Sequence, residues 1–225
     1  MDNNKSDPDF LSCHCDEIFY LPSEVVIHNK PDDCWVSYFG GVYDLTKFCN
    51  EADDEDVIKP IIANAGKDIS HWFDHGKNDI KYQLDESSGD VVICCPHGKI
   101  PNIIFGSKFR PLDKCPWWLD ENYKIGNLTI NSRPCKIVNT LTSCEVIILV
   151  CEEDKISKIQ ERYLAFNCHA SNYIWKFNGK KLDMNKTMTE NGMIDERERY
   201  TNCGLPENIY VPCIMCYFKD DLTVA

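Results

Sequence analysis

The chain has 225 residues, 43% of them hydrophobic, and a formal net charge of −12 at pH 7. This composition is sufficient for buried cores, and the length allows one large domain or two small ones. The excess of acidic residues argues against nucleic acid and anionic membrane surfaces as partners, because both bind through a basic face.

The amino-terminal segment, residues 1–17, is polar and acidic, and we expect it to be a tail without regular structure. No apolar run approaches the ~20 residues that a membrane-spanning helix requires, which predicts a soluble intracellular protein. Fourteen cysteines occur at irregular spacing. Without a secretory signal, they are interpreted as mostly reduced, buried thiols rather than as a disulfide framework.

A first domain is predicted over residues 18–93. Its first helix begins at Pro22, a residue that is favoured at the start of helices. Two strands, 34–39 and 42–45, follow as a hairpin around Gly40–Gly41, because a tight turn requires residues that tolerate positive φ angles.

Two further helices are predicted after the hairpin. Residues 57–65 are largely apolar and end at Gly66, a common residue after the last turn of a helix. Asp68 is expected to cap the second helix. His71 and His75, four residues apart, would project from the same face of that helix.

This order of elements resembles the cytochrome b5 family. The blocks at residues 20–25 (YLPSEV) and 42–48 (VYDLTKF) are similar to the family's signature, and residues 65–68 (AGKD) resemble the segment before its second haem ligand. In that family a His-Pro-Gly-Gly turn supplies the first axial histidine. Here residues 50–56 (NEADDED) stand at that position, so the usual first ligand is absent.

The resemblance implies a haem b site with altered ligands. His71 is the first candidate for the iron ligand, with His75 as its substitute, and Phe73 is expected to pack against the porphyrin. On the opposite side Tyr43 is the candidate donor and Cys49 its substitute. Because a phenolate suits ferric iron better than ferrous iron, binding would be conditional on the oxidised state. The alternatives are that His71 is an ordinary packed histidine and Tyr43 a core aromatic residue.

A linker is predicted over residues 94–130. It is irregular, with proline and glycine punctuation. It also contains Phe105, Phe109, Trp117 and Trp118. Aromatic residues in a connector usually pack along a surface, so we expect a semi-ordered segment that joins two domains.

A second domain is predicted over residues 131–225. Its pattern predicts a hairpin, a helix, two strands around a turn and a closing strand, at residues 135–139, 145–150, 154–166, 173–177, 180–182 and 213–218. This order resembles a ubiquitin-like β-grasp domain, as does the block at residues 175–182 (WKFNGKKL). The predicted fold is therefore α+β, a cytochrome b5-like haem-binding domain followed by a ubiquitin-like one.

The combination of the two halves resembles one family of b5-domain proteins found in motile cilia. The resemblance is carried by blocks at residues 59–61, 65–74, 116–118, 137–143 and 220–223. It implies a non-enzymatic structural component of the radial spoke stalk of the axoneme. Its location would be the cytoplasm, the cytoskeleton and the cilium axoneme, its partners other radial spoke or axonemal proteins, and its haem a redox-responsive element for ciliary beating.

Two other functions remain open from the sequence. One is a soluble b5-type electron carrier, which the missing ligand turn disfavours. The other is a purely structural interaction module with an empty pocket. An enzyme is not expected, because no arrangement of nucleophile, base and oxyanion donors is recognisable.

Overall fold

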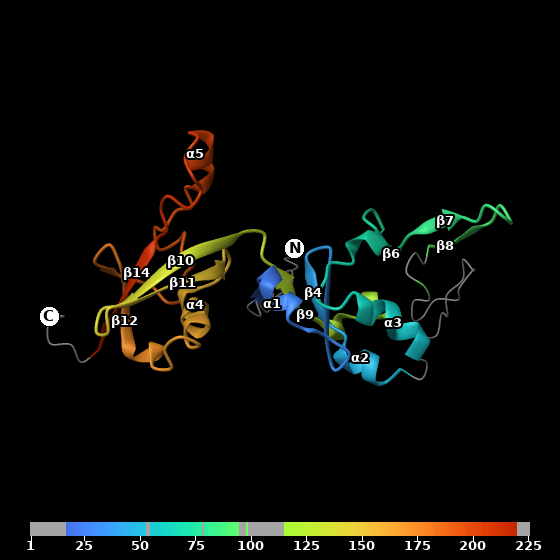
Figure 1. The fold of residues 1–225 in the computed structure, drawn as a ribbon, viewed down its shortest axis with the longest axis horizontal. Helices are drawn as coiled ribbons and strands as arrows, with labels where there is room; N and C mark the ends of the chain where they lie inside the picture. Colours follow the sequence, from blue (N-terminus) through green and yellow to red (C-terminus); the bar gives the residue numbers. More distant parts are fainter. Residues whose placement is uncertain (1–16, 53–54, 78, 95–97, 99–114, 220–225) are drawn as a thin grey trace, which may run out of the picture.

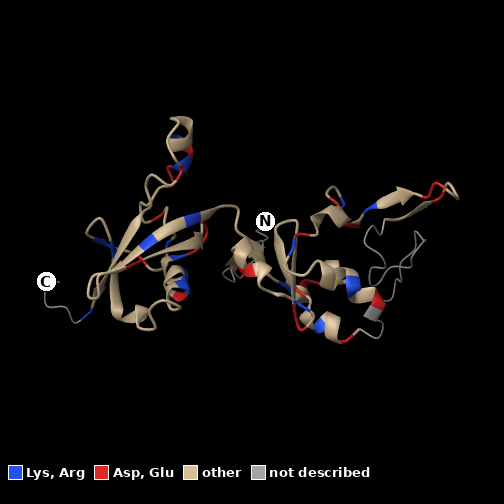
Figure 2. Cartoon of the chain, in the orientation of Figure 1, with Lys and Arg blue, Asp and Glu red and all other residues tan. Residues whose placement is uncertain are grey.

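The computed structural model describes residues 17–52, 55–77, 79–94, 98 and 115–219, and the chain in these ranges forms two mixed α and β domains (Figure 1). The predicted tail at residues 1–17 lies outside the described residues except for Glu17. None of the described helices is long and apolar enough to cross a membrane. Basic and acidic positions are interspersed on both domains (Figure 2).

The first domain is built on a five-stranded sheet. Its strand order is β1-β9-β4-β3-β2, with bounds Phe19–Tyr20, Lys124–Leu128, Gly41–Asp44, Asp33–Tyr38 and Asn29–Lys30. Strand β9 runs parallel to β1 and antiparallel to β4. The last strand of the domain in sequence therefore lies between its first strand and the hairpin.

The hairpin of β3 and β4 confirms the predicted strands and places the turn one residue earlier than the glycine pair. Its two central residues are Phe39 and Gly40, with φ angles of 47° and 79°. Positive φ at both positions is the geometry whose twist matches that of the flanking strands. The backbone N–H of Phe39 donates to the hydroxyl of Ser70, at 2.9 Å.

Three short helices lie around this sheet. They are α1 (Pro22–Val26), α2 (Thr46–Asn50) and α3 (Glu55–Ala63). Helix α1 begins at proline as predicted, and the carboxylate of Glu24 accepts the backbone N–H of Leu21 at 2.7 Å. Two small ribbons complete the domain, β5 (Phe73–Asp74) with β6 (Asp79–Ile80), and β7 (Tyr82–Leu84) with β8 (Val91–Ile93).

The predicted helix after Asp68 is wrong. Only a 3-10 turn, η1 (Ser70–Trp72), forms there, and β5 follows at once. Asp68 does accept the backbone N–H of Ser70 at 3.0 Å. Ile69 donates its N–H to the carbonyl of Ser37 on β3 at 2.8 Å. Phe73 is then extended and pairs with Ile80 of β6, so the chain leaves helical geometry after a single turn.

The predicted linker at residues 94–130 is also replaced by ordered structure in its second half. Residues 115–128 contribute the 3-10 turns η2 (Trp117–Leu119) and η3 (Glu121–Tyr123), and then β9. Trp117 is 1% exposed and Trp118 is 2% exposed, both within the core of the first domain. Burial of two indoles outweighs the irregular local sequence, so this segment belongs to the first domain.

The second domain has its own five-stranded sheet, with a helix packed on one face (Figure 1). The strand order is β11-β10-β14-β12-β13, with bounds Cys144–Cys151, Ser132–Asn139, Cys213–Phe218, Tyr173–Phe177 and Lys180–Lys181. Helix α4 (Ile156–Tyr163) buries Ile156, Ile159 and Tyr163. These elements confirm the order that the sequence predicted.

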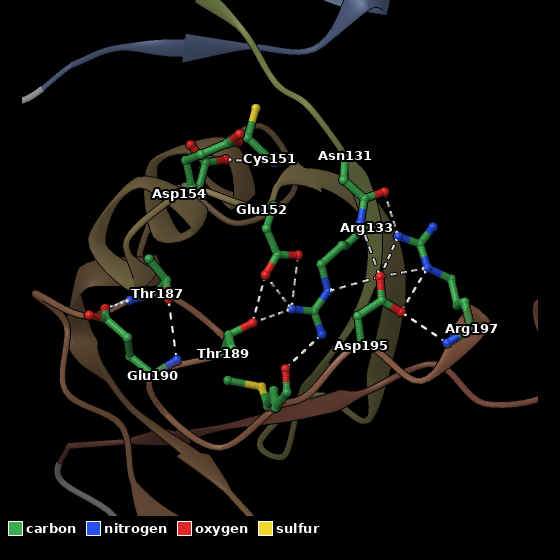
Figure 3. A network of polar contacts seen from close by, with 12 residues as sticks. Asn131, Arg133, Cys151, Glu152, Asp154, Thr187, Thr189, Glu190, Asp195 and Arg197 are labelled. Atoms are coloured by element: carbon green, nitrogen blue, oxygen red, sulfur yellow. Dashed lines mark hydrogen bonds and ion pairs between the residues drawn. The ribbon is translucent and has the colours of Figure 1, made fainter. Parts of the chain in front are cut away.

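A buried arginine fixes the long loop of the second domain. Arg133 is 2% exposed. Its guanidinium donates to Thr189 Oγ1 at 2.9 Å and to the carbonyl of Met193 at 2.6 Å, and it pairs with Glu152 at 3.1 Å (Figure 3). Because a buried charge is costly unless it is fully paired, these contacts fix the loop before the short helix α5 (Arg197–Asn202).

Arg162 of α4 joins the two domains. It pairs with Asp154 at 2.7 Å within its own domain. It also pairs with Glu24 of α1 and donates to the carbonyl of Phe19 at 3.2 Å. A second contact runs from the hydroxyl of Thr129 to the carboxylate of Glu153, at 2.6 Å.

Candidate functional site

The candidate site is an aromatic recess at the turn of the β3–β4 hairpin. Its volume is about 340 Å³. It is lined by Tyr38, Phe39, Gly41, Tyr43, Trp118, Leu119, Asp120, Glu121, Lys124 and Asn127. The hairpin supplies one wall, and the segment from η2 to β9 supplies the other.

Two stacked tyrosines form the floor of the recess. The rings of Tyr38 and Tyr43 lie 4.2 Å apart at an angle of 19°. Tyr38 donates its hydroxyl to the carbonyl of Trp118, which joins the two walls. Burial, reinforced by the hydrogen bond with Tyr43, raises the pKa of Tyr38 well above its ordinary value, so this phenol remains protonated.

Gly41 is required by the position of Tyr43. A Cβ atom at residue 41 would lie 2.7 Å from Cε2 of the Tyr43 ring. The ring therefore covers the strand backbone and leaves Tyr43 half-buried on β4. Tyr43 packs against the core, as one of the two predicted possibilities requires, and it also lines the recess. Its role as an iron ligand stays a prediction.

The two candidate histidines do not line this recess with Tyr43. His71 is exposed on η1, and its ring lies edge-on to Trp72 with the centroids 6.2 Å apart. His75 is exposed and lies 4.5 Å from the ring of Phe39. No contact described between residues 17 and 219 joins either imidazole to Tyr43.

Phe73 lies in the interior of the first domain. It is 1% exposed and stacks on Tyr38 with ring centroids 4.8 Å apart. The rings of Trp117 and Trp118 each lie 6.1 Å from it. The Trp118 indole donates to Asp79 at 3.2 Å. Phe73, which was expected to pack against a porphyrin, therefore packs against other aromatic side chains of the chain itself.

Cys49, the substitute donor, is buried beside a second cysteine. Its thiol is hydrogen-bonded to Cys34 of β3, and both side chains belong to the core. That contact and burial raise the pKa of the Cys34 thiol. No local pattern in the sequence predicts this pair, because its members lie fifteen positions apart.

These positions do not fit a haem held on both faces by His71 and Tyr43. A bis-ligated iron needs its two donors on opposite sides of one cavity, and the described structure does not bring them together. No group of three or more His, Cys, Asp or Glu side chains suited to a metal occurs among the described residues. Asp53 and Asp54, part of the segment in the place of the usual ligand turn, lie outside them.

The recess has an aromatic interior and a charged rim. Asp120, Glu121 and Lys124 supply the rim. The described lining contains no nucleophile paired with a general base. The role of Trp117 and Trp118 in closing this region was also missed. The adjacent pair of tryptophans after Pro116 was the available signal.

Comparison with known proteins identifies similarity over both domains. Residues 22–129 match the family described as Cytochrome b5-like Heme/Steroid binding domain. That span ends next to Leu128, the last residue of β9. It therefore includes the buried tryptophans and strand β9.

Full-length relatives match as well. The chain is 40% identical over 209 residues to cytochrome b5 domain-containing protein 1 of Homo sapiens, covering 91% of each chain. It is 41% identical over 214 residues to the protein of that name from Xenopus laevis, covering 91% of this chain and 96% of the relative. Among solved structures, cytochrome b5 of Ostreococcus tauri virus 2 is 41% identical, covering 22% of this chain and 61% of its own, with a TM-score of 0.20.

Proposed function

This chain belongs to the family of cytochrome b5 domain-containing protein 1, and from that premise we propose that it is a non-enzymatic structural component of the radial spoke stalk of the ciliary axoneme. Its partners would be other radial spoke or axonemal proteins, within the cytoskeleton of the cilium. The two relatives matched over most of their length are named for a domain and not for an enzyme, which agrees with this proposal.

The observation that carries the structural role is the packing of the b5-like interior. Phe73, Trp117 and Trp118 fill the space between the hairpin and the helices. An electron carrier needs an open cavity and two aligned ligands. A domain sealed by its own aromatic side chains is better suited to hold a shape for other proteins to bind.

The contact between the domains supports the same role. Arg162 has a side chain only 10% exposed, and its ion pairs reach Asp154 and Glu24 at once. Desolvated, multiply bonded arginine pairs are more rigid than exposed ones. Two domains held in this way form one extended unit that can bridge neighbours in a large assembly.

We further propose that the second domain is of the ubiquitin-like β-grasp class. The support is its order of hairpin, helix, two strands around a turn and closing strand. Strands β10 and β14, which are the first and the last strand of this sheet in sequence, lie side by side and parallel. The turn at Asn178 and Gly179 has φ angles of 49° and 77°, as its sequence predicted.

Location is tested by expressing a tagged chain in a ciliated cell. After detergent extraction of the ciliary membrane and matrix, the tagged chain is expected to remain with the axoneme, and proximity labelling is expected to recover radial spoke proteins. Complete release with the soluble fraction would contradict the proposal. A tagged second domain alone, residues 131–225, serves as a comparison, because it lacks the Glu24 contact of Arg162.

A second candidate function is a redox-responsive site for haem b. It is favoured by the match of residues 22–129 and by Tyr43, whose side chain lines a recess beside Lys124. Titration of the full chain with hemin, followed by dithionite, tests this candidate. A shifted Soret band that is lost in Tyr43→Phe or His71→Ala, retained in His169→Ala and weakened on reduction would support it. If the spectrum stays that of free hemin at every point of the titration, the proposal of a haem site is contradicted.

A further inference from the structure

Strand β11 is an unusually long edge. It spans eight residues, Cys144–Cys151, and among the described residues only β10 pairs with it. The other edge strands of the two large sheets, β1, β2 and β13, have two residues each. Strand β13 is made of two lysines. Short, charged edges discourage pairing with another chain, whereas β11 is long and carries a single charged residue, Glu145.

Hydrogen bonds of the neighbouring strands show which residues of β11 direct their backbone N–H and C=O groups toward β10 and which direct them toward the open edge. Glu152 donates its N–H to the carbonyl of Asn131 at 3.0 Å, and Lys136 donates to Pro212 on the β14 side at 2.9 Å. Odd-numbered residues of β10 therefore bond to β11 and even-numbered ones to β14. The register pairs Pro134 with Leu149 and Lys136 with Ile147.

Three residues of β11 consequently direct their backbone groups away from the sheet. They are Glu145, Ile147 and Leu149, since antiparallel strands alternate between bonded and non-bonded pairs. No backbone hydrogen bond is found for these groups within the described residues. Cys151, the next residue with this orientation, is not open to a partner strand, because its N–H donates to the carboxylate of Asp154 at 3.0 Å.

The side chains of the same residues make the edge apolar. Ile147 is 60% exposed and Leu149 is 51% exposed. Both stand on the sheet face opposite to α4, because the alternate residues Ile148 and Val150 are buried in the core. The carboxylate of Glu145 is held by Lys136 of the neighbouring strand.

We propose that β11 pairs antiparallel with β11 of a second copy of this chain, about a two-fold axis at Ile147. In this register Ile147 faces Ile147 of the partner copy, and Glu145 faces Leu149 of that copy. All three residues then form the doubly bonded pairs of an antiparallel ladder. The interface is self-complementary, as a two-fold contact requires.

The charges near the edge are compatible with this pairing. The two Lys136 side chains would stand three strand spacings apart, on the order of 14 Å. The Debye length at physiological ionic strength is about 8 Å, so their repulsion is screened. Each lysine is in addition neutralised by Glu145 of its own copy. Because only one strand of each copy takes part, the dimer is expected to be reversible and dependent on concentration.

Sedimentation of the full chain under reducing conditions tests the proposal. The weight-average mass is expected to rise with concentration from 26.0 kDa toward twice that value. Hydrogen exchange is expected to slow at the amides of Glu145, Ile147 and Leu149 over the same concentration range. A monomer at every concentration would overturn the proposal, and so would amide protection that appears only when a different protein is added.

Two lysine variants test the register. Ile147→Lys places two ammonium groups opposite each other and is expected to weaken the dimer by about tenfold. Leu149→Lys places its ammonium beside Glu145 of the partner copy and is expected to retain the dimer. Leu141→Lys, an exposed position in the turn before β11, controls for added charge. Equal loss in Ile147→Lys and Leu149→Lys would contradict the two-fold axis at Ile147. This inference goes beyond the proposed axonemal role and does not depend on it.

Discussion

The two domains of this chain close their cores in different ways. The second domain is continuous in sequence, and its helix α4 covers a sheet whose strands alternate regularly between buried and exposed residues. The first domain instead completes its core with a segment that is irregular in sequence, since Trp117 and Trp118 pack against Tyr38 and Phe73. The b5-like half therefore closes around a cluster of aromatic side chains, part of which comes from a segment without a regular apolar pattern.

The largest expected effect concerns the first domain. Trp117→Ala removes a side chain that is 1% exposed and contacts the rings of Tyr38, Phe48 and Phe73. Loss of a buried tryptophan should lower the free energy of unfolding by about 3–5 kcal/mol. Urea denaturation, followed by circular dichroism, measures this change.

The control for that experiment is Leu119→Ala, because Leu119 belongs to the same 3-10 turn and is exposed. It should change stability by less than about 0.5 kcal/mol. A loss of less than about 1 kcal/mol in Trp117→Ala would mean that the indole does not seal the core, and the contrast between the two domains would fail.

The corresponding change in the second domain is Arg133→Met. It leaves Glu152 without its buried partner and the carbonyl of Met193 without its donor. Removing one member of a buried ion pair should cost about 3 kcal/mol. Arg199→Met, at an exposed arginine of α5, is the matched control in the same denaturation experiment. Equal stability of the two variants would contradict the role given to Arg133.

The sequence predicted the second domain more completely than the first. Its alternation of apolar residues from Arg133 onward and the Asn178–Gly179 turn are local signals, and local signals determine a hairpin and an amphipathic helix. In the first domain, the predicted helix after Asp68 is wrong because Phe73 is extended and pairs with Ile80 of β6. Ile69 also bonds to Ser37 of β3. Neither a two-residue strand nor a contact across thirty residues leaves a periodicity in the sequence.

The candidate site was predictable only in part. Tyr43 could be singled out from the sequence because its block resembles the b5 signature. Its side chain does line the recess. Phe73 was expected to pack against a porphyrin. No pattern in the sequence indicated that Trp117 and Trp118 would pack against the Phe73 ring. The segment that carries them is irregular in sequence, and its strand β9 is recognisable only from its two neighbours β1 and β4.

A smaller effect is expected at the recess. Gly41→Ala places a methyl group against the Tyr43 ring, at 2.7 Å from its Cε2 atom, and should destabilise the first domain by about 1–3 kcal/mol. In a Tyr43→Ala background the same change should cost much less, because the ring is absent. A double-mutant cycle measures the coupling. Additive losses would show that Gly41 is constrained by something other than Tyr43.

The smallest effect is the acid sensitivity of the second domain. Hydrogen bonds from Arg197, and further from Asn131, hold the pKa of Asp195 well below its ordinary value (Figure 3). A lowered pKa in the folded state gives stability that is present above the unfolded pKa of about 3.9 and is lost as the pH falls below it. Asp195→Asn should therefore unfold with a weaker pH dependence between about pH 4 and pH 2. An unchanged profile would contradict this assignment.

The most direct measurement for the central claim is a hemin titration of the purified full chain, monitored by the Soret band and by tryptophan fluorescence. If the interior is sealed by Phe73, Trp117 and Trp118, the absorbance should remain that of free hemin and the fluorescence should not be quenched in a saturable manner. A stoichiometric complex with a shifted, sharp Soret band, retained after gel filtration, would contradict the claim and restore a cofactor role to the first domain.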